Sequence, residues 1–357
     1  AFMVFLYHVQ VFAPVPGPLF SVLRMGYLGV TFFFVLSGFV LTWSWSPLVR
    51  RSTFYVRRFA RIFPSHAAAW LLAVPVFYAI LPIAAPDFVK PVDPWILLLS
   101  FVLLQGWSTV PLILFAGNPA AWTLPVEFSC SAFHPFAQRL LAMFAVRRTL
   151  IAAALVVAIA WAYRGSAWLF AGTWWADLPA PIQHTPEFLL GMCLAWAFRS
   201  GWRPRVPVWL GLTLLAVVVV SIAIVPAALS GSLAAELTIR FGNEAFSLAC
   251  AVLIVAIVAS GLAGRRSIFG DRIQVRLGEW SFAFYLVHAT VIYGAMWIWP
   301  ALQPSWNNIL PATVLFVIGL GLAAILFQGV ERPLERRIRR WKDRRDARSL
   351  ERSVAEA

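Results

Sequence analysis

Long apolar runs alternate with short polar segments along almost the whole chain of 357 residues. Most of them are about 20 residues long, which is the length that a helix needs to cross the hydrocarbon core of a bilayer. Eleven runs can be delimited in this way. They cover residues 1–13, 27–47, 65–84, 95–117, 120–146, 150–168, 184–198, 207–229, 244–263, 277–300 and 309–329. The pattern predicts an all-α, polytopic membrane protein.

Basic residues gather in clusters between these runs, and the cytoplasmic loops of membrane proteins are enriched in Lys and Arg. The clusters are Arg50/Arg51/Arg57/Arg58/Arg61, Arg147/Arg148, Arg199/Arg203/Arg205, Arg265/Arg266/Arg272/Arg276 and the basic residues after Glu331. All of them fall on one side only if run 95–117 does not cross the bilayer, and Gln105, Gly106, Ser108 and Pro111 interrupt that run. We therefore predict ten transmembrane helices plus one re-entrant or interfacial segment, with both termini cytoplasmic.

A single membrane domain is expected over residues 1–330, followed by a basic cytoplasmic tail over residues 331–357. Only about 13 apolar residues precede Pro14, fewer than a spanning helix needs, so the first helix is expected to be truncated at its N-terminal end. The tail has few apolar residues and is predicted to be a charged helix that can contact membrane lipids. Its removal beyond Arg332 is expected to leave catalysis largely intact.

Composition supports a membrane location and argues against other classes. Only 12% of the residues are charged, about half the share of a typical soluble domain, and 61% are hydrophobic. The net charge of +14 is explained by the cytoplasmic clusters, and no nucleic-acid-binding motif accompanies it. The three cysteines lie in apolar stretches, and the five histidines show no HxxxH or HExxH pattern, so no metal site is predicted.

His8 lies inside the first apolar run, AFMVFLYHVQVF. An ionisable side chain at membrane depth is costly and marks a functional site by default. A neutral imidazole can take a proton from a hydroxyl group and so make its oxygen nucleophilic. A histidine that only hydrogen-bonds between helices is an equally good interpretation of the residue alone.

Two further groups of charged residues are candidates. Arg57, Arg58 and Arg61 occur at helical spacing just inside the membrane, where guanidinium groups could bind the phosphates of a donor such as coenzyme A. The alternative is that they only set the topology and contact lipid headgroups. Glu127 is predicted to be buried, where it could orient a histidine, hydrogen-bond a sugar or pair with an arginine.

Two more segments are weaker on their own. Tyr285 and His288 occupy one face of a late helix, where a histidine that packs between helices is the simpler interpretation. Gly29, Ser37 and Gly38 place small residues along one helix, which lets helices approach closely. Ser37 is not expected to be a nucleophile, because no GxSxG elbow is present.

These segments occur together, and in order, in one known family. The chain resembles the acyltransferase-3 family of integral-membrane enzymes, which acylate sugar hydroxyls on surface polysaccharides, lipid-linked glycans and some macrolides. The resemblance is carried by LYH at 6–8, GVTFFFVLSGF at 29–39, RRFARIFP at 57–64, WTLPVE at 122–127, EFLLGM at 187–192, SFAFYLVH at 281–288 and VERPLE at 330–335.

The resemblance implies a ten-helix core in the bacterial plasma membrane and an acyl-CoA, by default acetyl-CoA, as a co-substrate from the cytoplasm, with no permanently bound cofactor. It also implies that a first-helix histidine, matched by His8, is essential, and it raises the functional weight of Arg58, Arg61, Trp122 and Glu127. In the mechanism that we expect, the phosphates of the donor bind near Arg57, Arg58 and Arg61, and Glu127 is a candidate to aid His8 as the base. Trp122, Tyr285 and His288 become candidate contacts to a carbohydrate-containing acceptor. The resulting hypothesis is a membrane O-acyltransferase.

Two rival hypotheses use the same sequence features. A transporter or flippase for a glycan or lipid would also have many helices, a broken segment and buried charges, but no matching pair of interrupted helices occurs in the two halves. A scaffold or sensor acting through the basic tail would need a specific signalling motif, and the tail contains none.

Overall fold

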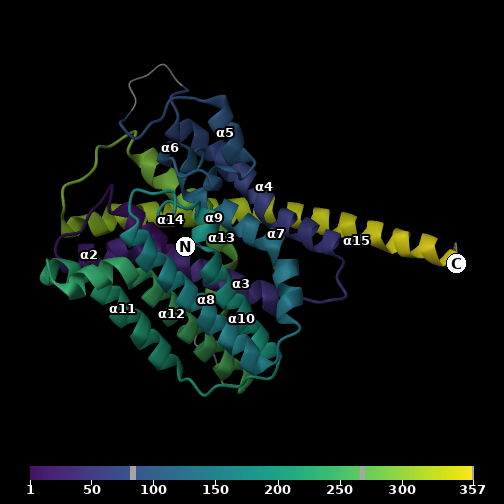
Figure 1. Ribbon diagram of the computed structural model, residues 1–357. Coiled ribbons are helices and arrows are strands. Elements are labelled where there is room, and N and C mark those ends of the chain that lie inside the picture. Colours follow the sequence, from purple (N-terminus) through teal and green to yellow (C-terminus); the bar gives the residue numbers. More distant parts are fainter. Residues whose placement is uncertain (81–85, 266–269, 356–357) are drawn as a thin grey trace.

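The structure is a computed structural model that describes residues 1–80, 86–265 and 270–355 (Figure 1). Every regular element in these ranges is helical, and an isolated bridge between Tyr78 and Lys90 is the one β feature there. The prediction of an all-α protein is confirmed. The end of run 65–84, Arg266 and the last two residues of the predicted tail lie outside the described residues.

Among the residues that the structure describes, ten helices have 15 residues or more. They are α3 (Gly29–Trp43), α4 (Arg51–Phe77), α7 (Leu124–Leu141), α8 (Val146–Leu169), α10 (Thr185–Arg199), α11 (Val208–Ala228), α12 (Leu233–Leu262), α13 (Arg272–Ala295), α14 (Ile309–Leu326) and α15 (Arg332–Ala355). The shorter elements that matter below are α1 (Phe2–Val9), α2 (Pro18–Arg24), η3 (Pro119–Thr123) and α9 (Ala180–Gln183).

Within the described ranges, six continuous helical segments are long and apolar enough to cross a membrane. They are Pro18–Trp43, Arg51–Phe77, Val146–Leu169, Val208–Ala228, Leu233–Leu262 and Trp306–Arg348. The apolar side chains of α8 and α11 are mostly exposed, with 6% of each apolar window buried inside the protein. Such helices are stable only in an apolar environment, so the protein is a membrane protein.

Two groups of helices build the interior. One core lies among α3, α7, α10 and α12, and includes Phe34, Phe188 and Ile254. The other lies among α1, α4, α13 and α14, and includes Phe5 and Phe284. Figure 1 shows α3, α8, α10, α11 and α12 running roughly side by side, with α4 and α5 on the other side of the molecule.

Small residues bring α3 and α10 together, and this pair makes the most extensive contact between helices. A Cβ atom on Gly38 would overlap the backbone carbonyl of Phe188, and one on Gly191 would overlap the carbonyl of Val35. The two backbones therefore touch where glycine removes the side chain. The expectation that small residues in this helix let helices approach closely is confirmed for Gly38.

Run 95–117 is not one helix. It consists of α5 (Pro94–Phe101), η2 (Gln105–Trp107) and α6 (Pro111–Leu114), and Leu103 between them has a φ of 61°. Gln105 and Gly106 are buried against the rest of the protein. Irregular backbone at membrane depth is tolerated only where protein or a wet cavity surrounds it, so the predicted interruption is confirmed.

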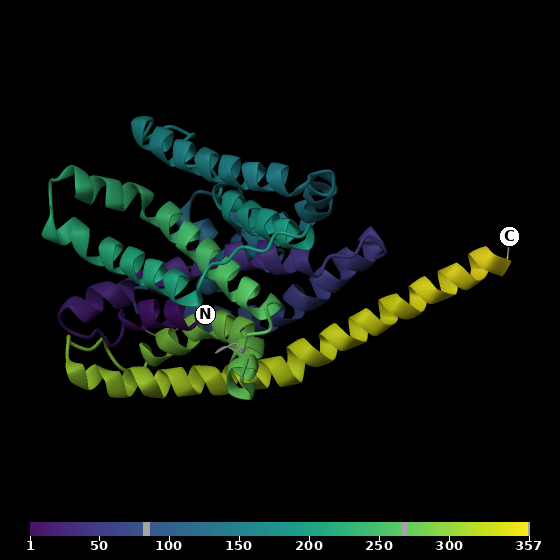
Figure 2. The ribbon, with the colours of Figure 1, turned by 90° about the horizontal axis from the view of Figure 1, so that it is seen from below.

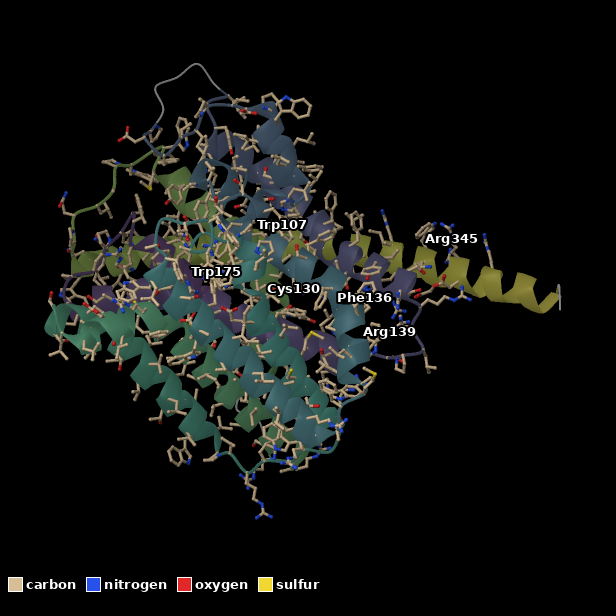
Figure 3. All side chains as sticks on the ribbon, in the orientation of Figure 1. Trp107, Cys130, Phe136, Arg139, Trp175 and Arg345 are labelled. Atoms are coloured by element: carbon tan, nitrogen blue, oxygen red, sulfur yellow. The ribbon has the colours of Figure 1, made fainter. Side chains whose placement is uncertain are left out.

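The C-terminal tail continues the last apolar helix. A π-helical turn, Phe327–Glu331, joins α14 to α15, and Figure 2 shows the two as one long helix that projects from the body. The predicted boundary at residue 331 thus falls inside a continuous helix. α15 packs along the first half of α4, where Asp346 accepts a hydrogen bond from Thr53 at 2.6 Å. Figure 3 shows Arg139 and Arg345 on the side from which α15 projects.

Candidate active site

A cavity of about 680 Å³ lies where the two groups of helices meet, and we call it the His8 cavity. That volume is typical of sites for small organic ligands. His8 and Tyr285 contribute to one wall, and Thr31, His184 and Asn243 to the other. The remaining lining residues are Val4, Tyr7, Tyr27, Val30, Phe115, Ala120, Trp122, Arg164, Ala167, Trp168, Ala176, Gln183, Ile239 and Arg240.

His8 is in the last turn of α1, and its ring is held from behind. Its Nδ1 atom lies 2.9 Å from the carbonyl oxygen of Val4 and 3.2 Å from Nε2 of His288. His288 is fully buried on α13, and its own Nδ1 lies 2.6 Å from the carbonyl oxygen of Tyr285. The structure thus brings together two histidines that are 280 positions apart.

Trp122 and Tyr285 line the same cavity as His8. Trp122 lies in η3, and the neighbouring Thr123 hydroxyl is 2.9 Å from the Tyr285 hydroxyl. This bond fixes the tyrosine ring between α13 and η3. His288 differs from these two, because it lies behind His8 and is not part of the cavity wall.

The polar side chains opposite His8 belong to a chain of hydrogen bonds that crosses three helices; Thr31, Asn243 and His184 line the cavity, and Glu187 holds them without lining it. Thr31 donates to Asn243 at 2.5 Å, Asn243 donates to Glu187 at 3.3 Å, and Nδ1 of His184 lies 3.2 Å from the same Glu187 oxygen. The other oxygen of Glu187, Oε2, is buried without a partner among the described residues.

Two arginines complete this wall. Arg164 is bound to Glu244 at 2.7 Å, and Arg240 lies over the ring of Trp168 at 3.4 Å from its centroid. None of the residues of this wall was a site candidate in the sequence. Glu187 and Glu244 bind residues of this wall without lining the cavity; they lie inside apolar runs, so the rule that identified His8 would also have identified them.

Glu127 lies on α7 and does not line the His8 cavity. Its carboxylate is bound to the guanidinium of Arg58 on α4, and its other oxygen accepts a hydrogen bond from Ser37 at 2.6 Å. Of the three roles that the sequence left open for Glu127, the geometry is that of a pair with an arginine. It makes no contact with His8, so an assisting role for Glu127 would have to act from a distance.

A second cavity, of about 440 Å³, lies between α3, α4 and α15, and we call it the arginine pocket. It is lined by Leu41, Ser44, Trp45, Ser46, Val49, Phe54, Arg57, Arg58, Arg61, Glu335 and Arg339. The three arginines predicted to act together are therefore in one place, joined by Arg339 from the tail. Sequence reasoning missed Arg339 because the tail shows no sign of folding back onto α4.

The arginines of the pocket already have acidic partners. Arg57 is bound to Asp343 at 3.1 Å, and Arg61 is bound to the buried Glu331 and lies 3.6 Å from Glu335. Each guanidinium has five N–H donors, so one carboxylate leaves several of them free for a phosphate.

The described residues contain no set of side chains arranged as metal ligands. No group of three or more His, Cys, Asp or Glu side chains within the described ranges is arranged to hold an ion. Cys130, Cys193 and Cys250 are all buried thiols.

Comparison with known proteins agrees with this arrangement. Residues 1–328 match the family model described as an acyltransferase domain of the acyltransferase-3 type. The chain is 32% identical to Acyltransferase MdmB from Streptomyces mycarofaciens over a region that covers 82% of this chain and 77% of that protein. No solved structure matches it.

The chain therefore belongs to the acyltransferase-3 family, and it is an enzyme that transfers acyl groups. This decides between the hypotheses drawn from the sequence. The acyltransferase hypothesis is confirmed, in preference to the transporter and the scaffold.

Proposed function

We propose that this protein is a membrane O-acyltransferase that moves an acyl group, by default acetyl, from acyl-CoA to a hydroxyl of a sugar-containing acceptor. The acceptor would be a cell-surface glycan or a glycosylated secondary metabolite such as a macrolide. One observation carries the proposal: His8 is held by its Nδ1 edge, and its remaining nitrogen is left for a cavity inside the helical bundle. A base in this arrangement can activate an alcohol away from bulk water.

The arginine pocket supports binding of the donor from the cytoplasm. Its four arginines would hold the phosphates of coenzyme A, which is the bidentate recognition that guanidinium groups favour. Helix α3 contributes to both cavities, so positions along it give the distance between them. Thr31 lines the cavity and Leu41 lines the pocket, which separates them by about 15 Å along the helix. The acyl end of the donor would have to extend across this distance.

The His8 cavity supports binding of the acceptor. Aromatic rings such as Trp122 give apolar surfaces for a sugar ring, and Asn243 and His184, both held by Glu187, give hydrogen-bonding partners for its hydroxyls. Sites for small molecules have this mixture of aromatic walls and a few placed polar groups.

The reaction needs one proton carrier. His8 Nε2 removes the proton from the acceptor hydroxyl while the oxygen attacks the thioester carbonyl carbon. The carbon–sulfur bond then breaks, and the leaving thiolate takes the proton from His8. The products are an ester and free coenzyme A, and His8 returns to its starting state.

Ten crossings with both termini in the cytoplasm are part of the proposal, and contacts between helix ends support them. Arg199 donates to the carbonyl of Thr42 at 2.8 Å, so the ends of α3 and α10 lie together. Trp196 donates to the carbonyl of Phe144 at 3.2 Å, which brings the start of α8 to the same end. These contacts place three of the basic clusters at the same end of the helices, which is the arrangement required if run 95–117 does not cross the bilayer.

An untargeted comparison of metabolites can identify the product. Glycans and secondary metabolites from a deletion strain and its parent are compared by mass spectrometry, and a mass difference of one acyl group names the product class. Membranes that contain the protein are then given acyl-labelled acetyl-CoA and the extract of the deletion strain. We expect label in the same product.

The mechanism is tested with His8→Ala in this assay. Loss of a general base lowers the rate by about 10²- to 10⁴-fold. The amount of variant protein in the membrane is measured in parallel, since poor expression would imitate lost activity. Full transfer activity in His8→Ala at normal expression would overturn the proposed mechanism.

A further inference from the structure

The contact between His8 and His288 restricts which ring nitrogens of the two side chains can carry a proton. A neutral imidazole carries a hydrogen on one nitrogen and a lone pair on the other. The hydrogen-bond partners of each nitrogen therefore decide which tautomer is present. Both rings have such partners in this structure.

His288 is assigned first. Its Nδ1 lies 2.6 Å from the Tyr285 carbonyl oxygen, which can only accept, so Nδ1 carries the hydrogen. In the neutral ring, Nε2 of His288 is then a lone pair. That lone pair faces Nδ1 of His8 at 3.2 Å.

The tautomer of His8 follows from that of His288. Its Nδ1 lies between two acceptors, the Val4 carbonyl oxygen at 2.9 Å and the His288 lone pair at 3.2 Å. A lone pair at this position would face two other lone pairs, so Nδ1 of His8 carries the hydrogen and shares it between them. Nε2 of His8 is consequently unprotonated, which is the state that a general base requires.

We propose that His288 is a positioning residue that holds His8 in the Nδ1–H tautomer and accepts more strongly from it when His8 becomes charged during transfer. This rests on the proposed function of His8 as the base. The role is the one that a carboxylate has behind the histidine of a serine-protease triad. A neutral imidazole does it here without placing a second charge in the membrane interior, where a lone carboxylate is costly.

This role differs from the contact to substrate that the sequence suggested for His288. The side chain is fully buried behind His8, and its other face stacks on Phe284 at an angle of 14°. A residue in this place acts on the acceptor only through His8. Its replacement should therefore change kcat and leave the KM for the acceptor unaltered.

Two variants separate the acceptor role from simple packing. His288→Leu keeps the volume and removes the lone pair, whereas the amide oxygen of His288→Gln can still accept from Nδ1 of His8. We expect His288→Leu to lower kcat about a hundredfold, the lower end of the effect of a general base, since the Val4 carbonyl still holds Nδ1. We expect His288→Gln to recover most of that loss.

His66 provides the matched control. It is also a fully buried histidine, it bonds to the Phe101 carbonyl at 3.1 Å, and it lines neither cavity. His66→Leu and His66→Gln should have equal kcat values. If kcat of His288→Leu stays at the wild-type value, or if only KM changes, the positioning role is overturned.

The tautomer can be read directly in the unaltered protein. Histidine ring nitrogens are labelled with ¹⁵N, and the His8 signals are identified by their absence from the His8→Asn spectrum. We expect a hydrogen on Nδ1 of His8, and a hydrogen on Nε2 instead would overturn the inference even if the His288 variants fail to fold. Activity in His8→Ala would overturn the proposed function itself, whatever the spectrum shows.

Discussion

Arg58 and Glu127 lie between the two cavities, where each depends on the other. Ser37 on α3 binds Glu127, and its position along that helix is between Thr31 in the His8 cavity and Leu41 in the arginine pocket. The carboxylate of Glu127 is almost fully buried, and about a fifth of the Arg58 side chain is exposed. Pairing is what makes both charges tolerable at this depth.

Glu127→Ala should destabilise the protein because it leaves the Arg58 charge without its partner. Breaking a buried pair costs about 3–5 kcal/mol, so the unfolding temperature in detergent should fall clearly. The double variant Arg58→Met with Glu127→Leu removes both charges and should recover most of that stability. It should stay inactive with acyl-CoA, because Arg58 is lost from the arginine pocket.

The double variant separates the two roles of the pair. If it recovers both stability and activity, Arg58 has no part in donor binding. If Glu127→Ala unfolds at the wild-type temperature, the pair does not stabilise the fold.

Single residues of the site could be predicted where their chemistry conflicts with the membrane. His8 and Glu127 were found because an ionisable group in an apolar run needs an explanation. The contact between His8 and His288 could not be found in this way, since it depends on how α1 packs against α13. Arg339 was missed for the same reason, because a charged tail gives no sign of the helix it will contact.

At the scale of elements, the apolar runs predicted the helices well and their contacts poorly. Run 27–47 became α3, run 207–229 became α11, and the interruption of run 95–117 was confirmed. The neighbours of each helix could not be predicted, because lipid and protein interior are both apolar and select similar side chains. Glycine in α3 indicated a close contact with another helix, but the sequence did not indicate that this helix is α10.

The helix α15 gives a prediction of its own. The tail was expected from its composition to be dispensable for catalysis, but α15 contributes Glu335 and Arg339 to the arginine pocket. Arg339→Glu places a negative charge beside the proposed phosphate site and should raise the KM for acyl-CoA about tenfold, which corresponds to about 1.4 kcal/mol. The rise of unfolding temperature on adding coenzyme A should shrink accordingly.

Arg340→Glu is the matched control, since Arg340 is exposed and lines neither cavity. It makes the same change of net charge one residue further along α15. Equal effects of the two variants would show that the tail acts through its overall charge, and the arginine pocket would lose its assigned role.

At the scale of the whole molecule, the charge pattern predicts that the basic clusters share one side, and contacts place three of them at one end of the helices. The hydrogen bonds of Arg199 and Trp196 join basic clusters that are far apart in sequence, and loops without clusters meet at other places. Near Pro14, for instance, the Asn308 side chain donates to its carbonyl at 2.7 Å. The arginine pocket lies at the helix ends that carry the basic clusters, and the His8 cavity is lined by residues nearer the other ends, such as Ala176 between α8 and α9 and Arg240 near the start of α12.

Cysteine labelling tests this arrangement in spheroplasts of an expression host. Cys130, Cys193 and Cys250 are buried and are first replaced by alanine in a variant that keeps its activity. Ser200→Cys then places a thiol after α10, and Ser230→Cys places one between α11 and α12; both positions are exposed. With ten crossings, a membrane-impermeant maleimide should label Ser230→Cys in intact spheroplasts and Ser200→Cys only after lysis. If residues 95–117 crossed the bilayer, every later loop would change sides and the two results would be exchanged.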